Sequence, residues 1–482
     1  MGDAKQAWWQ CSAVGLAGAY RRGETSPLEV LQHGWSRIDA VNPRLNALIA
    51  PRRYASLAEA AQSAERFARG LPLGALDGIP LAVKDNIPSA DQPTRWGTLA
   101  GQAYQAAQDE LALARARAAG AVVVGKTNLP EFAMDGYTGN RLFGTTGNPW
   151  NPALTPGGSS GGSVAAVAAG RVPLALGTDG GGSTRRPAAY TGLVGFKPAI
   201  GAIARAHTLP PLLLDFEVIG PIGRSVADVQ LLFGALRGPH PGDRRSWAAA
   251  RHQALPPRLR VLYVPMLHGA PVDAEIAVSC RAAAARLSAL GHSVDEGDLP
   301  LDLGFITAAW PTVGQVGLAW LFERHARWCD GAAPWFTELA EAGAQIPAAT
   351  LWQWLEAFEP LRRDVAELFN RYDLIVMPAA AALPWPAAEA CPPIIAGQSV
   401  GPRGHAIFTA WVNAACLPAV DLPCAPSADG LPIGVQLIGG YRWLCPYDDA
   451  LLALAAGFEA TAPQGWSWPV LEGRATPAGQ QC

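Results

Sequence analysis

The sequence has little charge and no excess of basic residues. Lys and Arg number 37 and Asp and Glu number 40, so the formal net charge of the 482-residue chain is 37 − 40 = −3. This balance supplies no strongly basic face for a nucleic-acid backbone, and we expect no nucleic-acid partner. Only 16% of the residues are charged and 50% are hydrophobic, which indicates a large folded protein and excludes a disordered one.

Long apolar runs are also missing. No stretch of about 18 residues is free of Gly, Pro and charge, so we expect no membrane-spanning helix and no membrane partner. Residues 1–30 do not show a basic start, an apolar centre and a small-residue cleavage site, so we expect no signal peptide.

The sequence lacks closely spaced pairs of cysteines or histidines of the kind that bind metals. The eight cysteines are scattered without a Cys-x-x-Cys pair, which predicts reduced thiols in a cytoplasmic protein. The eight histidines include no His-Glu-x-x-His or comparable pair, so we expect neither a metal nor another cofactor.

What the sequence does contain is an alternation of helical segments with short apolar runs. Helices are predicted over 25–50, 54–69, 109–119 and 273–290, and strands over 79–84, 121–125 and 259–264. Strands that are apolar on both faces belong to a sheet covered by helices on both sides, so the fold class is α/β.

We expect one domain over 1–482, because nothing indicates that either half closes a core alone. Within it, 1–70 is a helical entry, 71–235 holds the unusual motifs, and 236–482 completes the same domain. The Pro- and Arg-rich segment 237–258 is expected to be a surface connection.

Two Gly/Ser-rich turns, at 157–163 and 180–184, stand out. The segment between them holds a helix-compatible stretch, 164–169, and an apolar strand, 172–176, so the turns are not flexible linkers between domains. A phosphate-binding Gly-x-x-x-x-Gly-Lys-[Ser/Thr] loop is excluded because neither turn has the lysine. Gly157–Gly161 does satisfy Gly-x-Ser-x-Gly, the nucleophile elbow of esterases, but the preceding NPWNPALTP has three prolines where a buried strand is required.

A fourth interpretation uses both turns together. The amides of Gly180, Gly181, Gly182 and Ser183 can converge into an oxyanion hole, because glycine permits the concave backbone that such a turn needs. Ser183 would then be a nucleophile beside its own oxyanion donors, and the other turn offers a second hydroxyl. Lys84, at the end of an apolar strand, can supply the base.

These segments resemble a known family. LAVKDNI, PGGSSGGS and GTDGGGSTRR, in this order and spacing, are similar to the motifs of the amidase signature family of Ser-Ser-Lys hydrolases, and the resemblance covers most of the chain. It implies the amidase signature fold, a central mixed twisted sheet with helices on both faces.

The resemblance assigns roles to particular residues. It implies that Lys84 is the base, Ser159 the bridging serine after a cis peptide bond, and Ser183 the nucleophile. Supporting roles fall on Ser160, Asp179 and Arg185. The chain departs from the family's usual pattern at Asp91, Arg95, Trp96 and Gly180, and whether Arg95 and Trp96 shape the entrance of the site is left open by the sequence.

The substrate is less constrained. Tryptophan is dense between 300 and 411, and family resemblance implies that this region and the loop Met134–Thr138 line a substrate channel. We therefore expect Met134, Gly136, Tyr137, Thr138 and Trp411 to bind substrate. Large aromatic residues also fill cores, so core packing stays open for about half of the tryptophans.

This composition favours a bulky apolar or aryl amide, anilide or carbamate, hydrolysed through an acyl-enzyme at Ser183. Esterase and urethanase activities are compatible with the same site. Two alternatives stay open: a glutaminase-type subunit of a tRNA-dependent amidotransferase, and a Gly-x-Ser-x-Gly esterase that uses Ser159. The expected partner is a small-molecule substrate, with the chain as a monomer or homodimer.

Overall fold

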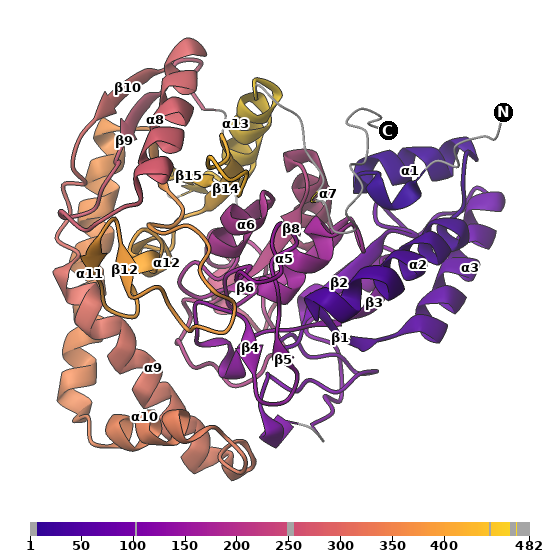
Figure 1. The fold of residues 1–482 in the computed structure, drawn as a ribbon, viewed down its shortest axis with the longest axis horizontal. Coiled ribbons are helices and arrows are strands. Elements are labelled where there is room, and N and C mark those ends of the chain that lie inside the picture. The colour runs from indigo at the N-terminus through magenta and orange to yellow at the C-terminus, as the bar shows by residue number, and fades with distance from the viewer. Residues whose placement is uncertain (1–6, 102–103, 248–254, 443–444, 463–468, 470–482) are drawn as a thin grey trace.

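The computed structural model describes residues 7–101, 104–247, 255–442, 445–462 and 469. Its centre is an eleven-stranded mixed sheet in the order β1-β3-β2-β6-β8-β7-β14-β15-β11-β9-β10 (Figure 1). The strands are β1 (Leu48–Pro51), β2 (Pro80–Lys84), β3 (Val122–Thr127), β6 (Leu174–Asp179), β7 (Val194–Lys197), β8 (Val218–Gly223), β9 (Arg260–Tyr263), β10 (Ser293–Glu296), β11 (Leu374–Pro378), β14 (Ala419–Pro423) and β15 (Gly434–Gly439). Three two-stranded ribbons are β4 (Gly139–Asn140) with β5 (Gly144–Thr145), β12 (Ile394–Ile395) with β13 (Gln398–Ser399), and β16 (Tyr441–Arg442) with β17 (Cys445–Pro446).

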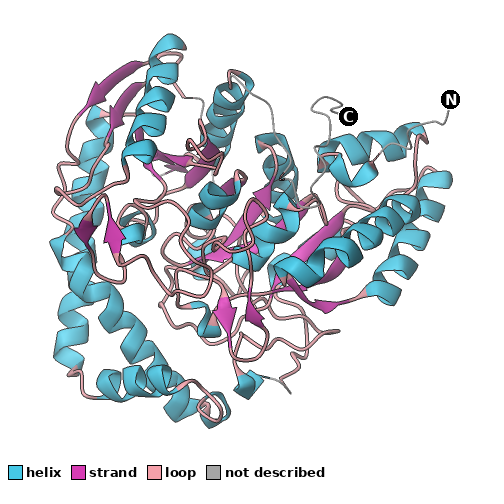
Figure 2. Cartoon of the chain, viewed as in Figure 1, coloured by secondary structure: helices cyan, strands magenta, loops and turns pink. Residues whose placement is uncertain are grey.

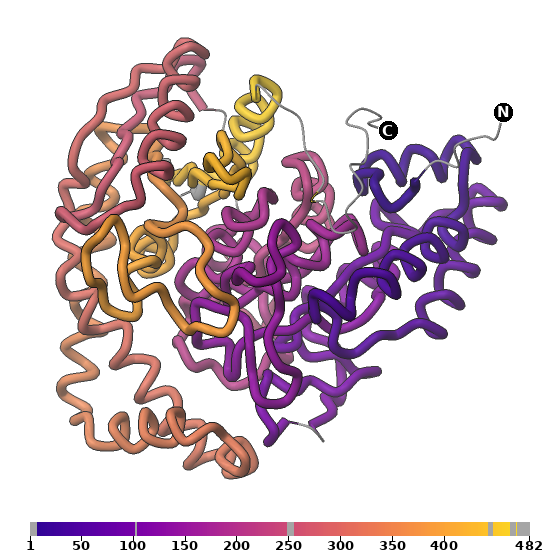
Figure 3. The backbone as a smooth tube through the Cα atoms, viewed as in Figure 1, coloured from indigo at the N-terminus to yellow at the C-terminus, as the bar shows by residue number. Residues whose placement is uncertain are grey.

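Helices account for most of the remaining regular structure (Figure 2). They are α1 (Ala13–Arg22), α2 (Pro27–Leu45), α3 (Arg53–Ala68), α4 (Leu111–Ala118), α5 (Gly161–Ala168), α6 (Arg185–Thr191), α7 (Val226–Leu236), α8 (Ala274–Ala289), α9 (Gly304–Arg324), α10 (Pro334–Ala344), α11 (Ala348–Arg371), α12 (Ala410–Ala414) and α13 (Asp448–Ala460). The backbone trace places α1–α3 at one end of the molecule and α9–α11 at the other (Figure 3).

The sheet is buried on both faces because alternate residues of its strands point to opposite helix layers. In β2, Leu81 and Val83 join a core cluster with residues of α1, α4, α7, α8 and α13. Ala82, between them, joins a different cluster with α2, α3 and α5. In β11, Ile375 and Met377 pack with α9, α11 and α12. The fold is thus the α/β arrangement with a mixed sheet and two helix layers that the sequence predicts.

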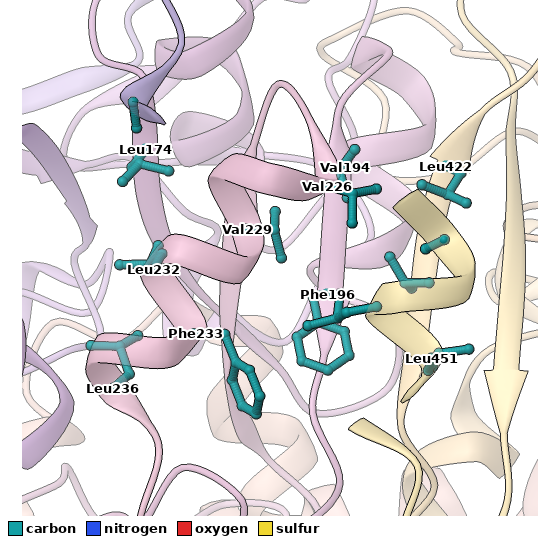
Figure 4. Close-up of a cluster of buried hydrophobic side chains, with 14 of the residues drawn as sticks. Leu174, Val194, Phe196, Val226, Val229, Leu232, Phe233, Leu236, Leu422 and Leu451 are labelled. Carbon is teal, nitrogen blue, oxygen red and sulfur yellow. The ribbon is translucent and has the colours of Figure 1, made fainter. Parts of the chain in front are cut away.

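One part of this core shows how the layers are joined. Residues of α7 and α13 cover β6, β7 and β14, and the ring of Phe233 meets that of Phe196 edge-on with centroids 5.1 Å apart (Figure 4). Burial of apolar surface of this kind contributes about 25 cal/mol per Å².

Most predicted elements occur with small changes of boundary, but the helix predicted over 25–50 is wrong at its end: α2 stops at Leu45, and β1 begins at Leu48 and pairs with β3. The strand expected over 172–176 runs from Leu174 to Asp179 instead, because β8 pairs with it antiparallel along its whole length. The helix expected from 164 begins at Gly161. Of the connection 237–258, residues 248–254 lie outside the described part.

The structure can be compared with two further expectations, the absence of a membrane-spanning helix and the reduced state of the cysteines. Among the described residues, α9 alone has the length and composition to cross a membrane; Leu318 and Leu321 on this helix are buried in a core cluster. The expectation that every thiol is reduced is wrong for Cys11, which is disulfide-bonded. Among the other cysteines whose side chains the structure describes, the free ones are Cys280, Cys329, Cys391, Cys416 and Cys424.

Candidate active site

Lys84 is the last residue of β2 and is completely buried. Its Nζ donates to Ser159 Oγ at 2.8 Å and to Thr178 Oγ1 at 2.9 Å. Asn86 Nδ2 donates to the same threonine oxygen at 3.0 Å. The base and bridging serine expected from the sequence therefore meet, and Thr178 and Asn86 fix the lysine's other side.

Burial sets the charge state of this lysine. Removal from water lowers the pKa of Lys84 to about 7, while the negative charges of Glu217 and Asp179 oppose the shift and Arg205 reinforces it. A lysine is a base only when it is neutral, and a pKa near 7 leaves about half of the molecules in that form at pH 7.

The two Gly/Ser turns face each other. The peptide bond between Gly158 and Ser159 is cis, as the family resemblance implies. The next amide, of Ser160, donates to the carbonyl oxygen of Ser183 at 3.1 Å. Ser160 Oγ donates to the Thr178 carbonyl at 3.1 Å, so Ser160 links the serine turn to the end of β6.

The second turn folds around the carboxylate of Asp179. Gly182 N donates to Asp179 Oδ1 at 2.7 Å, and Thr184 N donates to Oδ2 at 3.1 Å. The Gly182 amide is thus already paired and does not serve as the oxyanion donor expected of it. Gly180 and Gly181, the other glycines expected to be oxyanion donors, precede it in the same turn.

Asp179 and Arg185 are held in a buried polar network. Arg185 Nη2 donates to Asp179 Oδ1 at 3.0 Å and to Asn413 Oδ1 at 2.6 Å, and its Nη1 donates to Gln436 Oε1 at 3.1 Å. Burial alone would raise the pKa of Asp179, but the Arg185 guanidinium holds it well below its usual range. The carboxylate therefore stays ionised and keeps the turn in place.

Sequence reasoning missed several residues of this network. Thr178 and Arg186 could have been noticed, because they adjoin residues already singled out. Arg186 donates to Thr409 Oγ1 at 2.8 Å and to the Gly181 carbonyl, and the Thr409 hydroxyl donates to that carbonyl at 2.7 Å. Asn413 and Gln436 lie more than 200 residues away from Arg185, and nothing in a single sequence points to them.

A cavity of ≈ 140 Å³ adjoins this site. Asn86, which contacts Thr178, is at one edge, and the apolar wall is formed by Trp96, Phe132, Ala133, Met134, Leu209, Pro210, Pro211, Leu212, Leu213 and Leu214. Its other polar groups belong to Arg205, Thr208, Glu217 and Arg245. Met134 and Trp96 are thus placed at the cavity, whereas Arg95 lies over the Phe143 ring at 5.6 Å.

The other expected substrate-binding residues lie elsewhere. Trp411 is 1% exposed and packs in the core cluster of α9 and α11, so it is a core residue. Thr138 is buried and supports the serine turn: its hydroxyl donates to Gly157 O at 2.8 Å and accepts from Gly161 N at 3.2 Å.

Gly136 and Tyr137 complete that loop. A Cβ at Gly136 would lie 2.3 Å from Nε2 of the buried His405, and Tyr137 packs against the cluster of Tyr190 and Trp385. Both residues therefore adjoin side chains on the Ser159 side of the site and not the apolar cavity.

Several tryptophans of the expected channel are also placed otherwise. Trp310, Trp328 and Trp385 are buried, while Trp320, Trp335 and Trp352 are exposed on α9, α10 and α11. Of the group between 300 and 411, Trp310 comes nearest to the oxyanion turn, since a Cβ at Gly181 would lie 3.2 Å from its Nε1.

The geometry excludes the alternative of an esterase that uses Ser159, and the side-chain positions can also be searched for a metal site. No strand lies between β5 and Ser159 in this fully described stretch, so the serine is not on the strand-to-helix elbow of an esterase. Within the described ranges, no group of three His, Cys, Asp or Glu side chains could hold a metal ion.

A serine on a glycine-rich turn, a second serine and a neutralised lysine define the class of serine amidohydrolases that use lysine as the base. The comparisons agree with the site: the sequence model of the Amidase family matches residues 29–443, and the chain belongs to the amidase signature family. It is therefore an enzyme that hydrolyses carbon–nitrogen bonds of amides.

Sequence relatives and structural neighbours differ in function. The chain is 32% identical to a glutamyl-tRNA(Gln) amidotransferase subunit of Picosynechococcus sp., covering 91% of this chain and 96% of the relative. It is 34% identical to the corresponding protein of Symbiobacterium thermophilum, over 89% and 93%.

Among solved structures, a bacterial aryl acylamidase of this family has a TM-score of 0.87 at 28% identity, covering 97% of this chain and 99% of that one. A 6-aminohexanoate cyclic dimer hydrolase has a TM-score of 0.85 at 29% identity, over 96% and 99%. The peptide amidase of Stenotrophomonas maltophilia has a TM-score of 0.79 at 27% identity, over 96% and 99%.

Proposed function

We propose that this amidohydrolase cleaves bulky apolar or aryl amides, anilides or carbamates through an acyl-enzyme at Ser183. The cavity beside Asn86 and the oxyanion turn carries the proposal. Its ≈ 140 Å³ is close to the roughly 150 Å³ of a cavity that accommodates benzene, and its lining combines apolar side chains with the polar groups of Asn86, Arg205, Glu217 and Arg245. The similarity to a bacterial aryl acylamidase supports the same substrate class.

The hydrogen bond between Lys84 and Ser159 supports a relay mechanism. When Lys84 is neutral, the 2.8 Å contact lets the Ser159 hydroxyl donate to Nζ. Ser159 can then take the proton of Ser183 as Ser183 Oγ attacks the substrate carbonyl carbon. The Gly180 and Gly181 amides stabilise the oxyanion, and the same relay returns the proton to the leaving nitrogen as the C–N bond breaks. Water completes hydrolysis of the acyl-enzyme.

Intact-mass spectrometry tests the proposal. Wild type incubated with acetanilide-type amides, aryl carbamates and glutamine should gain the acyl mass from the first two. Ser183→Ala should show no adduct and lose several orders of magnitude in kcat. Ser159→Ala should keep slow acylation by activated esters, since it retains the nucleophile. An adduct on another residue with Ser183 unmodified would contradict the assignment.

A glutaminase-type role is the second candidate, favoured by the amidotransferase relatives. It predicts that glutamine is turned over faster than any anilide and that partner chains co-purify. Side-by-side kcat/KM values on the purified chain separate the two proposals.

A further inference from the structure

Gly180 is required for space and not for backbone conformation. Its φ lies outside the left-handed region, unlike that of Gly182 at 108°. A Cβ at Gly180 would, however, lie 2.8 Å from Leu213 Cδ1. Carbon atoms that are not bonded do not approach this closely without displacement, so any larger residue must move Leu213.

The backbone that carries Leu213 is anchored to α9. It belongs to the segment 207–214, in which Leu209 and Leu212 are buried in a core cluster with Leu318 and Leu321 of α9. The backbone of this segment touches the same helix, since a Cβ at Gly317 would lie 2.3 Å from the Leu212 carbonyl oxygen. The backbone next to Leu213 is therefore held against α9, and the half-buried Leu213 side chain extends from it toward Gly180.

The other side of Leu213 faces a second space-making glycine. A Cβ at Gly314 of α9 would lie 3.9 Å from Leu213 Cδ2 and 3.0 Å from Met134 Cε. Leu213 thus stands between the oxyanion turn and Met134, and it forms part of the cavity wall. Its two methyl groups fill the volume next to the point where the substrate carbonyl would bind.

We propose that Leu213 determines specificity by limiting the width of the group attached to the scissile carbonyl, with Gly180 as its packing partner. Flat or unbranched groups fit beside Leu213, and groups branched at the carbon next to the carbonyl are rejected. This inference rests on the proposed acyl-enzyme at Ser183, and it holds whether the preferred leaving group is an aryl amine, an alcohol or ammonia.

A double-mutant experiment tests the pairing. The rates of p-nitrophenyl acetate and p-nitrophenyl pivalate hydrolysis would be measured for wild type, Leu213→Ala, Gly180→Ala and the double variant. The two esters share a leaving group and differ only in branching. Leu213→Ala should raise the pivalate-to-acetate ratio of kcat/KM at least tenfold, within the range that methyl groups produce in apolar pockets.

Gly180→Ala should lower kcat/KM for both esters, because its new methyl group pushes Leu213 into the cavity. The double variant should recover to within about threefold of Leu213→Ala, because the clash is gone. Leu71→Ala is the matched control: Leu71 is 68% exposed, lies outside the cavity lining and is absent from the three atoms nearest to a Cβ at Gly180. It should neither change the ratio by more than threefold nor rescue Gly180→Ala.

The proposal is overturned if the ratio is unchanged in Leu213→Ala, or if the Gly180→Ala loss is the same with and without Leu213. Leu213→Val, a smaller change, should give an intermediate ratio and serves if Leu213→Ala does not fold. Anilide and glutamine turnover by wild type decides the proposed function separately, so a failure of one idea is distinguishable from a failure of the other.

Discussion

The titration of Lys84 predicts the pH dependence of the reaction. With a pKa of about 7, the neutral fraction rises from about 9% at pH 6 to about 91% at pH 8. The value of kcat/KM should therefore increase about tenfold over this interval and level off above it. An unperturbed lysine, with a pKa of about 10.4, would be neutral in roughly one molecule in 2,500 at pH 7.

The variant Glu217→Gln tests whether the local charges set this midpoint. Burial lowers the pKa of Lys84, and the Glu217 carboxylate is the largest charge opposing that shift. Its removal leaves the positive charge of Arg205, which keeps its ion pair with Glu110 at 2.8 Å. The midpoint should move to lower pH by about 0.5–1 unit, equivalent to a charge interaction of about 0.7–1.4 kcal/mol.

The assay is kcat/KM for one anilide between pH 5 and 9.5, with Glu338→Gln on exposed α10 as the control that should leave the midpoint in place. A flat wild-type profile, or a midpoint above pH 9, would refute the neutral-lysine mechanism. An upward shift in Glu217→Gln would refute the electrostatic argument alone.

Three further predictions concern the network and the cavity. Asn413→Ala should lower the free energy of unfolding by about 2–3 kcal/mol in urea titrations, because the buried, charged Arg185 loses its 2.6 Å hydrogen bond to the Asn413 side chain. A loss below 0.5 kcal/mol would contradict this. Burial raises the pKa of Asp421, whose carboxyl oxygens have no hydrogen-bond partner among the described residues. The contribution of this carboxyl to stability is therefore complete below the unfolded pKa of about 4 and declines as pH rises toward the folded pKa. Melting temperatures of Asp421→Asn should consequently fall less between pH 5 and 8 than those of wild type, and parallel curves would count against it. Trp96→Ala should reduce kcat/KM for an anilide more than tenfold, whereas Trp352→Ala, at a residue 72% exposed, should change it less than twofold; equal effects would show that the cavity is not the substrate site.

Local sequence signals were sufficient for some strands of the sheet and for the lysine. The apolar run before Lys84 and the run over 121–125 predicted β2 and β3, because residues buried on both faces must all be apolar. Only their similar Gly/Ser composition suggested that the two glycine-rich turns belong to one site. Their contact, from Ser160 N to Ser183 O, required the strand order of the whole sheet.

Other features depend on tertiary contacts that no local pattern encodes. The sequence suggested that Trp411 lines the substrate channel, but α12 turns its side chain into the core. The amide of Gly182 was expected to point toward substrate, and the Asp179 carboxylate takes it instead. The position of Trp411 and the hydrogen bond of the Gly182 amide both depend on which other groups the fold brings next to them. A local sequence pattern does not show those neighbouring groups.

The position of Lys84 follows from the sheet itself. β2 and β6 are parallel neighbours, with Val83 paired to Leu176, so their carboxyl ends reach the same edge and place Lys84 beside Thr178. β2 is an interior strand of the sheet, and burial at its end lowers the pKa of the lysine. The base is therefore produced by the location of the strand, and no second charged side chain within hydrogen-bonding distance is needed to neutralise it. The same burial makes the charged form of Lys84 unfavourable. Near neutral pH the folded protein therefore contains the neutral lysine that catalysis requires.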